Sequence, residues 1–146
     1  MSEIRELVER HYRYVNEQAF DREAEVLSPD LVTVEPSAGT IRGIEPFMGY
    51  LRTFARAFPD GRLEPKVFVE EGNRVVVEGV YTGTQTGVLS GPGGDVPPSG
   101  RRLDLPYCDV FEAEAGRIVA HHVYYDQMLF ARQMGLVPDA AGASRD

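Results

Sequence analysis

The hydrophobic period of this chain changes after residue 58 from mainly helical to mainly alternating, and this change constrains the fold more than any other feature. Before it, apolar residues recur every three to four positions, as they do on amphipathic helices. From Leu63 onward they alternate with polar residues, as they do on strands with one buried face. Helices first and long hairpins second are typical of an α+β domain with its helices on one face of a sheet. We expect a single domain over residues 1–138 and a disordered tail over residues 139–146.

The first part of the chain predicts three helices and one strand. The first helix carries its apolar residues on one stripe, with Arg and Glu residues opposite. Ser28-Pro29-Asp30 breaks the second helix ahead of the strand. Pro46 falls in the first turn of the third helix, where a missing N–H costs nothing. The predicted elements are helices over Glu3–Gln18 and Asp21–Leu27, a strand over Leu31–Glu35, and a helix that follows Gly43 and ends at Pro59.

The second part predicts two antiparallel hairpins and a last helix. Each hairpin turns at a short run that contains glycine. A Gly/Pro-rich loop over Gly87–Gly100 separates the hairpins, and a loop of this length is either mobile or functional. The long strands are expected to form a curved antiparallel sheet around the helices, with one end of the cone open for a ligand. The predicted elements are strands over Leu63–Glu70, Arg74–Thr86, Arg101–Glu112 and Arg117–Tyr125, and a short C-terminal helix over Gln127–Met134 capped by Asp126.

Composition and charge exclude several classes of protein. The formal net charge is −8 and there are no runs of Lys or Arg, which argues against nucleic acid and anionic membranes as partners. No apolar run approaches the roughly 20 residues of a membrane-spanning helix. The N-terminus lacks a signal-peptide core, so we expect a cytoplasmic protein. Cys108 is the only cysteine and cannot form an internal disulfide.

The strand Leu103–Phe111 carries the most informative candidate residue. One face of this strand is apolar, and Asp109 lies in its middle, two residues after Tyr107. A carboxyl group among apolar neighbours is costly to ionise. Asp109 is therefore either a functional acid of a pocket or a buried acid that is bonded to a backbone N–H or a tyrosine.

The histidines and one glutamate leave further alternatives open. His11 lies on the apolar stripe of the first helix, where it is either a satisfied core residue or a donor at a pocket floor. His121 and His122 are adjacent and point to opposite faces of a strand, and alternation does not decide which one faces a pocket. No third ligand stands near them, so we expect no metal site. Glu35 is either a solvated strand end or a second acid at the pocket mouth.

Several short motifs resemble those of the SnoaL-like polyketide cyclases, a family of the nuclear transport factor 2-like superfamily. The resemblance implies a cone-shaped fold with a pocket that binds polyketide- or steroid-like carbonyl compounds and uses no cofactor. It extends to relatives of the cyclases, the ketosteroid isomerases, which move protons with acid and base side chains. The motifs are Phe58-Pro59-Asp60, Gly83-Thr84-Gln85-Thr86-Gly87, Pro98-Ser99-Gly100-Arg101, Gly116-Arg117-Ile118-Val119, Asp126, and Arg132-Gln133-Met134-Gly135-Leu136.

The resemblance also implies roles for individual residues. Asp109 falls where the isomerases keep a neutral, donating Asp and where the cyclases have a pocket His. His11 falls near the donor tyrosine of the isomerases' first helix. Glu35-Pro36 resembles their Asp-Pro base when one residue is skipped in the alignment.

On the last strand, the resemblance places His121, Val123 and Tyr125 inward. His121 matches a cyclase histidine. Val123, in contrast, stands where the cyclases have their proton-abstracting Asp. The cyclase mechanism therefore does not transfer to this chain, and the type of reaction is left open.

The leading hypothesis is a cyclase- or isomerase-type enzyme of secondary or lipid-like metabolism. Asp109 would polarise a carbonyl group, and His121 or Glu35 would move the proton. One alternative is a non-catalytic ligand-binding or dimerisation module of the same fold. Another is an epoxide hydrolase-like enzyme, which requires an Arg between two acids in the pocket. Expected substrate-binding residues are Tyr107, Val123, Tyr125, Phe54 and Phe58.

We also expect a homodimer. The outer faces of the later strands carry more apolar area than a small monomer usually exposes. These outward residues are predicted to be Val110, Ile118, Ala120 and Tyr124.

Overall fold

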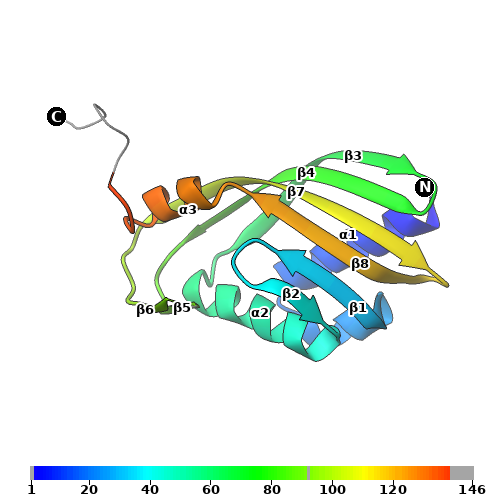
Figure 1. Ribbon diagram of the computed structural model, residues 1–146, viewed down its shortest axis with the longest axis horizontal. Helices are drawn as coiled ribbons and strands as arrows, with labels where there is room; N and C mark the ends of the chain where they lie inside the picture. Colours follow the sequence, from blue (N-terminus) through cyan, green and yellow to red (C-terminus); the bar gives the residue numbers. More distant parts are fainter. Residues whose placement is uncertain (1, 92, 139–146) are drawn as a thin grey trace.

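The structure, a computed structural model, describes residues 2–91 and 93–138, and the predicted tail from Asp139 lies outside them. Helices and strands follow one another largely in the predicted order (Figure 1). The elements are α1 (Glu3–Asn16), the 3₁₀ helix η1 (Phe20–Glu25), β1 (Leu27–Glu35), β2 (Gly39–Arg42), α2 (Ile44–Ala57), β3 (Arg62–Glu71), β4 (Arg74–Thr84), β5 (Leu89–Gly91), β6 (Gly94–Val96), β7 (Arg102–Glu114), β8 (Arg117–Tyr125) and α3 (Gln127–Gln133).

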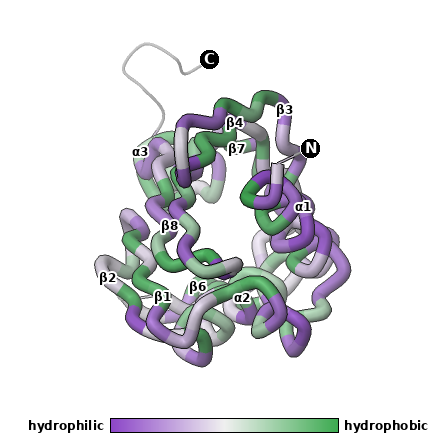
Figure 2. Tube along the Cα trace, turned by 90° about the vertical axis from the view of Figure 1, so that its right-hand side faces the viewer, coloured by the Kyte–Doolittle hydropathy of each residue, from purple (hydrophilic) through white to green (hydrophobic). Residues whose placement is uncertain are grey.

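A curved six-stranded sheet with the order β2-β1-β8-β7-β4-β3 forms the main layer of the molecule. Neighbouring strands are antiparallel except for β1 and β8, which run parallel. Seen end-on, the strands β3, β4, β7 and β8 and the helices α1 and α2 surround the interior (Figure 2). The arrangement is therefore the predicted α+β domain, with a sheet that curls around the helices. Within the described part of the chain, no helix is long and apolar enough to cross a membrane.

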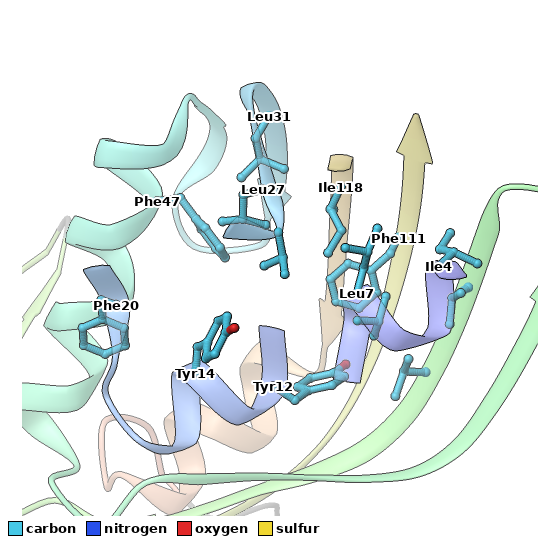
Figure 3. Close-up of a cluster of buried hydrophobic side chains, with 14 of the residues drawn as sticks. Ile4, Leu7, Tyr12, Tyr14, Phe20, Leu27, Leu31, Phe47, Phe111 and Ile118 are labelled. Atoms are coloured by element: carbon cyan, nitrogen blue, oxygen red, sulfur yellow. The ribbon is translucent and has the colours of Figure 1, made fainter. Parts of the chain in front are cut away.

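Local sequence explains why α1 begins where it does. The Ser2 side chain accepts a hydrogen bond from the backbone N–H of Arg5, which caps the first turn. Glu3 and Glu6 lie in that turn, where the helix dipole favours negative charge. The buried face of α1 contacts η1, β3, β4 and β8, and its side chains share a hydrophobic cluster with residues of β1 and β7 (Figure 3). Its buried residues are Ile4, Leu7, Val8, His11, Tyr12 and Tyr14.

The predicted bounds of the second helix and of the strand after it are wrong. The helix is a 3₁₀ turn that ends at Glu25, and β1 already begins at Leu27. The Ser28-Pro29-Asp30 run, predicted as a break, lies inside β1 where the register with β8 shifts. Pro29 is tolerated there because an irregular stretch needs no ladder hydrogen bond from its nitrogen. The short strand β2 was not predicted.

The Gly/Pro-rich segment between β4 and β7 is not a plain loop. It contains the hairpin β5–β6, and the fully buried Gln85 holds it. The Gln85 amide donates to the carbonyl groups of Gly87, Val96 and Pro97, and Ser99 donates to its oxygen at 2.6 Å. The buried amide of Gln85 thus holds together a segment whose Gly and Pro content predicts a loop.

The pattern of β8 departs from strict alternation near its start. The register between β7 and β8 shifts between Glu112 and Ala113, opposite the first residues of β8. Ile118 consequently points into the core and is fully buried, so its predicted place on the outer face is wrong. Tyr124, in contrast, is 49% exposed on the outer face as predicted.

Candidate functional site

A cavity of about 110 Å³ lies between α1, α2 and the concave face of the sheet. All of the predicted pocket residues except Glu35 line it. A cavity of about 150 Å³ accommodates benzene, so this one matches a single ring or part of a larger molecule. Its polar lining residues are His11, Gln18, Asp109 and His121, together with the hydroxyl groups of tyrosines. Its aromatic lining residues are Phe20, Phe47, Tyr50, Phe54, Phe58, Tyr81, Tyr107, Tyr125 and Phe130.

Strand register places Asp109 and His121 in the cavity. In the β7–β8 ladder Asp109 pairs with Val123, and Phe111 pairs with His121. The ring of His121 stacks on Phe111 with centroids 4.4 Å apart. His122 points the other way and stacks on Tyr124 at the outer surface. The structure thus decides between the adjacent histidines, and His121 is the inward one.

Asp109 is 4% exposed and has two polar neighbours. The Tyr12 hydroxyl donates to Oδ2 at 2.7 Å, so Asp109 is both a pocket residue and a tyrosine-bonded acid. Nε2 of His121 lies 3.1 Å from Oδ1, which is within ion-pair distance. The alignment is nevertheless poor, and among the described residues neither ring nitrogen of His121 forms a hydrogen bond. Nε2 of His121 is therefore close to a carboxylate, and neither ring nitrogen is committed to a hydrogen bond within the described residues.

Tyr12 stays a hydrogen-bond donor over a wide pH range. Burial raises the pKa of its phenol well above the usual value, and the negative charge of Asp109 raises it further. Asp109 accordingly acts as an acceptor toward Tyr12.

His11 forms a second buried polar pair, with Glu23 of η1. Nδ1 of His11 lies 2.9 Å from both carboxylate oxygens, and the side chains are 2% and 0% exposed. Burial alone disfavours a charged ring, but the Glu23 carboxylate, with help from Asp109, outweighs it and raises the pKa of His11 above 6.5. Sequence reasoning missed Glu23, because it lies among other acidic residues of a short segment that reads as solvated surface.

Glu35 lies behind the wall of the cavity. One oxygen accepts from the Ser37 hydroxyl and from the backbone N–H groups of Ser37 and Ala38, which fixes the turn between β1 and β2. The other oxygen accepts from the Tyr50 hydroxyl at 3.0 Å and the Tyr125 hydroxyl at 2.6 Å. Glu35 is 1% exposed, so it is not a solvated strand end. Its hydrogen bonds orient two tyrosines that line the cavity.

Tyr107 depends on a glycine for its position. A methyl group at Gly79 would meet the Tyr107 hydroxyl and the Glu64 carbonyl oxygen at 2.5 Å, so only glycine fits there. The hydroxyl is buried and has no hydrogen-bond partner within residues 2–91 and 93–138. Burial raises the pKa of Tyr107, which keeps the phenol neutral.

Metal ligation has no obvious place in this arrangement. Among the residues that the structure describes, no three His, Cys, Asp or Glu side chains form a group suited to a metal ion.

Comparison with known proteins identifies the family. The model of the SnoaL-like polyketide cyclase family matches residues 5–134. The chain belongs to this SnoaL-like family. No curated protein sequence matches it significantly.

Solved structures of other SnoaL-like and related proteins share the fold. TsrD from Streptomyces laurentii is 27% identical with a TM-score of 0.80, over 92% of this chain and 96% of that one. IdmH from Streptomyces antibioticus, described as a candidate polyketide cyclase, is 25% identical with a TM-score of 0.77, over 90% and 98%. A SnoaL-like protein from Jannaschia sp. CCS1, 24% identical with a TM-score of 0.81 over 93% and 94%, shows the same cone-shaped nuclear transport factor 2-like fold.

Proposed function

We propose that this SnoaL-like protein is a cofactor-independent acid–base enzyme of the cyclase or isomerase type that acts on an apolar carbonyl compound. The observation that carries the proposal is the contact between Asp109 and His121 inside a cavity with aromatic walls. Buried acid and base groups in a largely apolar pocket are suited to general acid–base catalysis. The similarity to IdmH, which is described as a candidate polyketide cyclase, supports a reaction of the polyketide type.

In the proposed reaction, His121 removes a proton from the carbon next to the carbonyl group. The C–H bond breaks, the proton moves to a ring nitrogen, and the electron pair shifts onto the carbonyl oxygen as an enolate. Asp109 stabilises the resulting imidazolium from 3.1 Å. The enolate carbon then either attacks a second carbonyl group, as in a cyclisation, or takes the proton back at another position, as in an isomerisation.

This assignment changes the role that we expected for Asp109. Because Oδ2 accepts from Tyr12 and Oδ1 lies 3.1 Å from Nε2 of His121, both oxygens of Asp109 face protein groups, and we assign Asp109 to supporting the base. Glu35 is committed to five hydrogen bonds outside the cavity wall, so His121 is the better candidate for the proton-moving group. Val123 lines the same cavity and offers no proton acceptor.

Exchange of α-protons for deuterium tests the proposal without knowledge of the natural substrate. Acetophenone and 1-tetralone are single- and double-ring ketones, and NMR in D₂O follows the loss of their α-protons. We expect the wild-type protein to accelerate exchange and His121→Gln to abolish the acceleration. His122→Gln is the matched control, because His122 faces outward, and it should exchange at the wild-type rate.

A non-catalytic binding module is the second candidate, and Val123 favours it. Such a protein would bind the ketones and leave their α-protons untouched. The epoxide hydrolase-like alternative has no support, because no Arg belongs to the cavity lining within the described residues.

A further inference from the structure

The pair of His11 and Glu23 is built like the oriented histidine of a catalytic dyad. Both carboxylate oxygens of Glu23 lie 2.9 Å from Nδ1, so this nitrogen carries a proton and points at η1. The two nitrogens of an imidazole lie on opposite edges of the ring, so Nε2 points away from Glu23. Within the described residues, the side-chain hydrogen bonds of His11 all use Nδ1, which leaves Nε2 without a partner. His11 lines the cavity, and with Nδ1 held by Glu23, Nε2 is the ring nitrogen left for a ligand.

The surroundings of His11 favour a charged ring. Three titratable side chains approach it from other elements of the fold: Glu23 from η1, Asp109 from β7 and His121 from β8, whose ring centroid is 5.8 Å away. Tyr12, on its own helix, is 5.6 Å away and stays neutral. The remaining ring neighbours are Phe47 of α2 and Phe111 of β7, which carry no charge. Two carboxylates thus face the imidazole rings of His11 and His121, and all four side chains are buried.

We propose that Glu23 is a positioning residue that holds His11 as a cation with its Nε2–H in the cavity, where His11 donates to the carbonyl oxygen of the substrate. This inference rests on the proposed function for its chemical purpose. His11 then polarises the carbonyl group, a role that Asp109 does not fill because its two oxygens face Tyr12 and His121. The cavity then holds a proton donor on α1 and a proton acceptor on β8.

This arrangement of donor and acceptor stabilises the enolate that the reaction forms. As His121 takes the α-proton, negative charge develops on the carbonyl oxygen, and a cationic donor stabilises that charge more than a neutral one does. His11 keeps its proton in a hydrogen bond to the enolate oxygen, or transfers it to give the enol and takes it back in the reverse step. The Glu23 carboxylate neutralises the cation throughout, so no unpaired charge is buried.

The carbonyl resonance of a bound ketone measures this polarisation without any turnover. The test uses acetophenone labelled with ¹³C at the carbonyl carbon and the 146-residue chain, whose three histidines are His11, His121 and His122. We expect the bound resonance to move downfield, and this displacement to disappear as pH rises through the titration of His11. The ring resonances of the three histidines, each assigned from a His→Gln variant, give the titration of His11 separately from that of His121.

Substitution of Glu23 sharpens the test. Glu23→Gln retains an acceptor for Nδ1 but removes the charge, so His11 should lose its proton at lower pH and the carbonyl displacement should end there too. Acetophenone should bind roughly tenfold more weakly at neutral pH, as expected for loss of a charged donor. Asp21→Asn removes an exposed acid of the same 3₁₀ helix and should match the wild type.

Three results would overturn the proposal. One is a carbonyl displacement that titrates with His121 or does not change with pH. Another is an unchanged displacement and affinity in Glu23→Gln. The third is acetophenone that does not bind, or binds beside the His121 ring without a displacement.

If Glu23→Gln does not fold, the wild-type titration decides alone. If polarisation is found but α-proton exchange is not, the proposed function fails and this inference stands.

Discussion

Val123 pairs with Asp109 across the β7–β8 ladder, so an apolar side chain lies next to the buried carboxylate. By resemblance, an acid occupies this position in polyketide cyclases. Among the described residues, the cavity lining therefore has one carboxylate and not two adjacent ones, and the two histidines supply the remaining acid–base groups.

Val123→Asp should destabilise the protein at neutral pH. Position 123 is half-buried, so the new carboxylate is only partly hydrated, and it is repelled by the neighbouring buried carboxylate of Asp109. We expect the free energy of unfolding to fall by about 2–4 kcal/mol at neutral pH and to recover in part as acid protonates one of the pair. Urea unfolding at several pH values measures this. Equal losses at all pH values would show that repulsion is not the cause.

Stability should depend on pH through His11. The pKa of His11 is raised above 6.5 in the folded protein. Below pH 6.5 the folded and the unfolded chain both hold the His11 proton, and the stabilisation by the His11–Glu23 pair is complete. As pH rises further, the unfolded chain loses its proton first, and this stabilisation is lost as pH passes through the pKa of His11 in the folded protein. The free energy of unfolding should therefore decline in this window for the wild type and not for the double variant His11→Gln/Glu23→Gln. Parallel curves for the two proteins would contradict the assignment.

Two neighbouring tyrosines should respond in opposite ways to loss of their hydroxyl groups. The Tyr12 hydroxyl bonds a carboxylate, so Tyr12→Phe should cost about 1.5–3 kcal/mol of unfolding free energy. The Tyr107 hydroxyl is buried without a partner in the described region, so Tyr107→Phe should be neutral or stabilising. Thermal and urea unfolding measure both. A large loss in Tyr107→Phe would mean that its hydroxyl has a structural partner.

The outer face of the sheet should mediate a homodimer. Tyr124 is 49%, Val67 46% and Val69 56% exposed, on outward positions of β8 and β3. Burying such side chains against a second copy would remove a large apolar area from water. Light scattering at micromolar concentration should give twice the chain mass for the wild type and a monomer mass for Tyr124→Lys. A monomeric wild type would refute the prediction.

Much of the fold could be predicted from the sequence because the periodic patterns are strong. Alternation placed Asp109 inward, and Asp126 caps α3 as expected, accepting from the N–H groups of Met128 and Leu129. The errors lie where local irregularity overrides pattern. Pro29 is absorbed by a register shift in β1, and the shift opposite Ile118 turns an expected surface residue into the core.

The candidate site could be predicted only in part, because its contacts join distant segments. His11, Asp109 and His121 were all candidates, yet nothing local in the sequence pairs His11 with Glu23 across the turn between α1 and η1. Alternation could not choose His121 over His122, since both faces of β8 are fairly apolar. Glu35 was a candidate base, but its acceptor capacity is used by a turn and two tyrosines that the sequence does not connect.

A double-mutant cycle on α-proton exchange tests most directly whether Asp109 and His121 act as one unit. The rates of exchange of acetophenone and 1-tetralone are measured for wild type, Asp109→Asn, His121→Gln and the double variant. General acid–base catalysis contributes about 10²- to 10⁴-fold, so His121→Gln should lose the acceleration and Asp109→Asn much of it. Because the residues work through the same proton, the double variant should exchange no more slowly than His121→Gln alone. Losses that multiply in the double variant, or wild-type exchange in either single variant, would contradict the account.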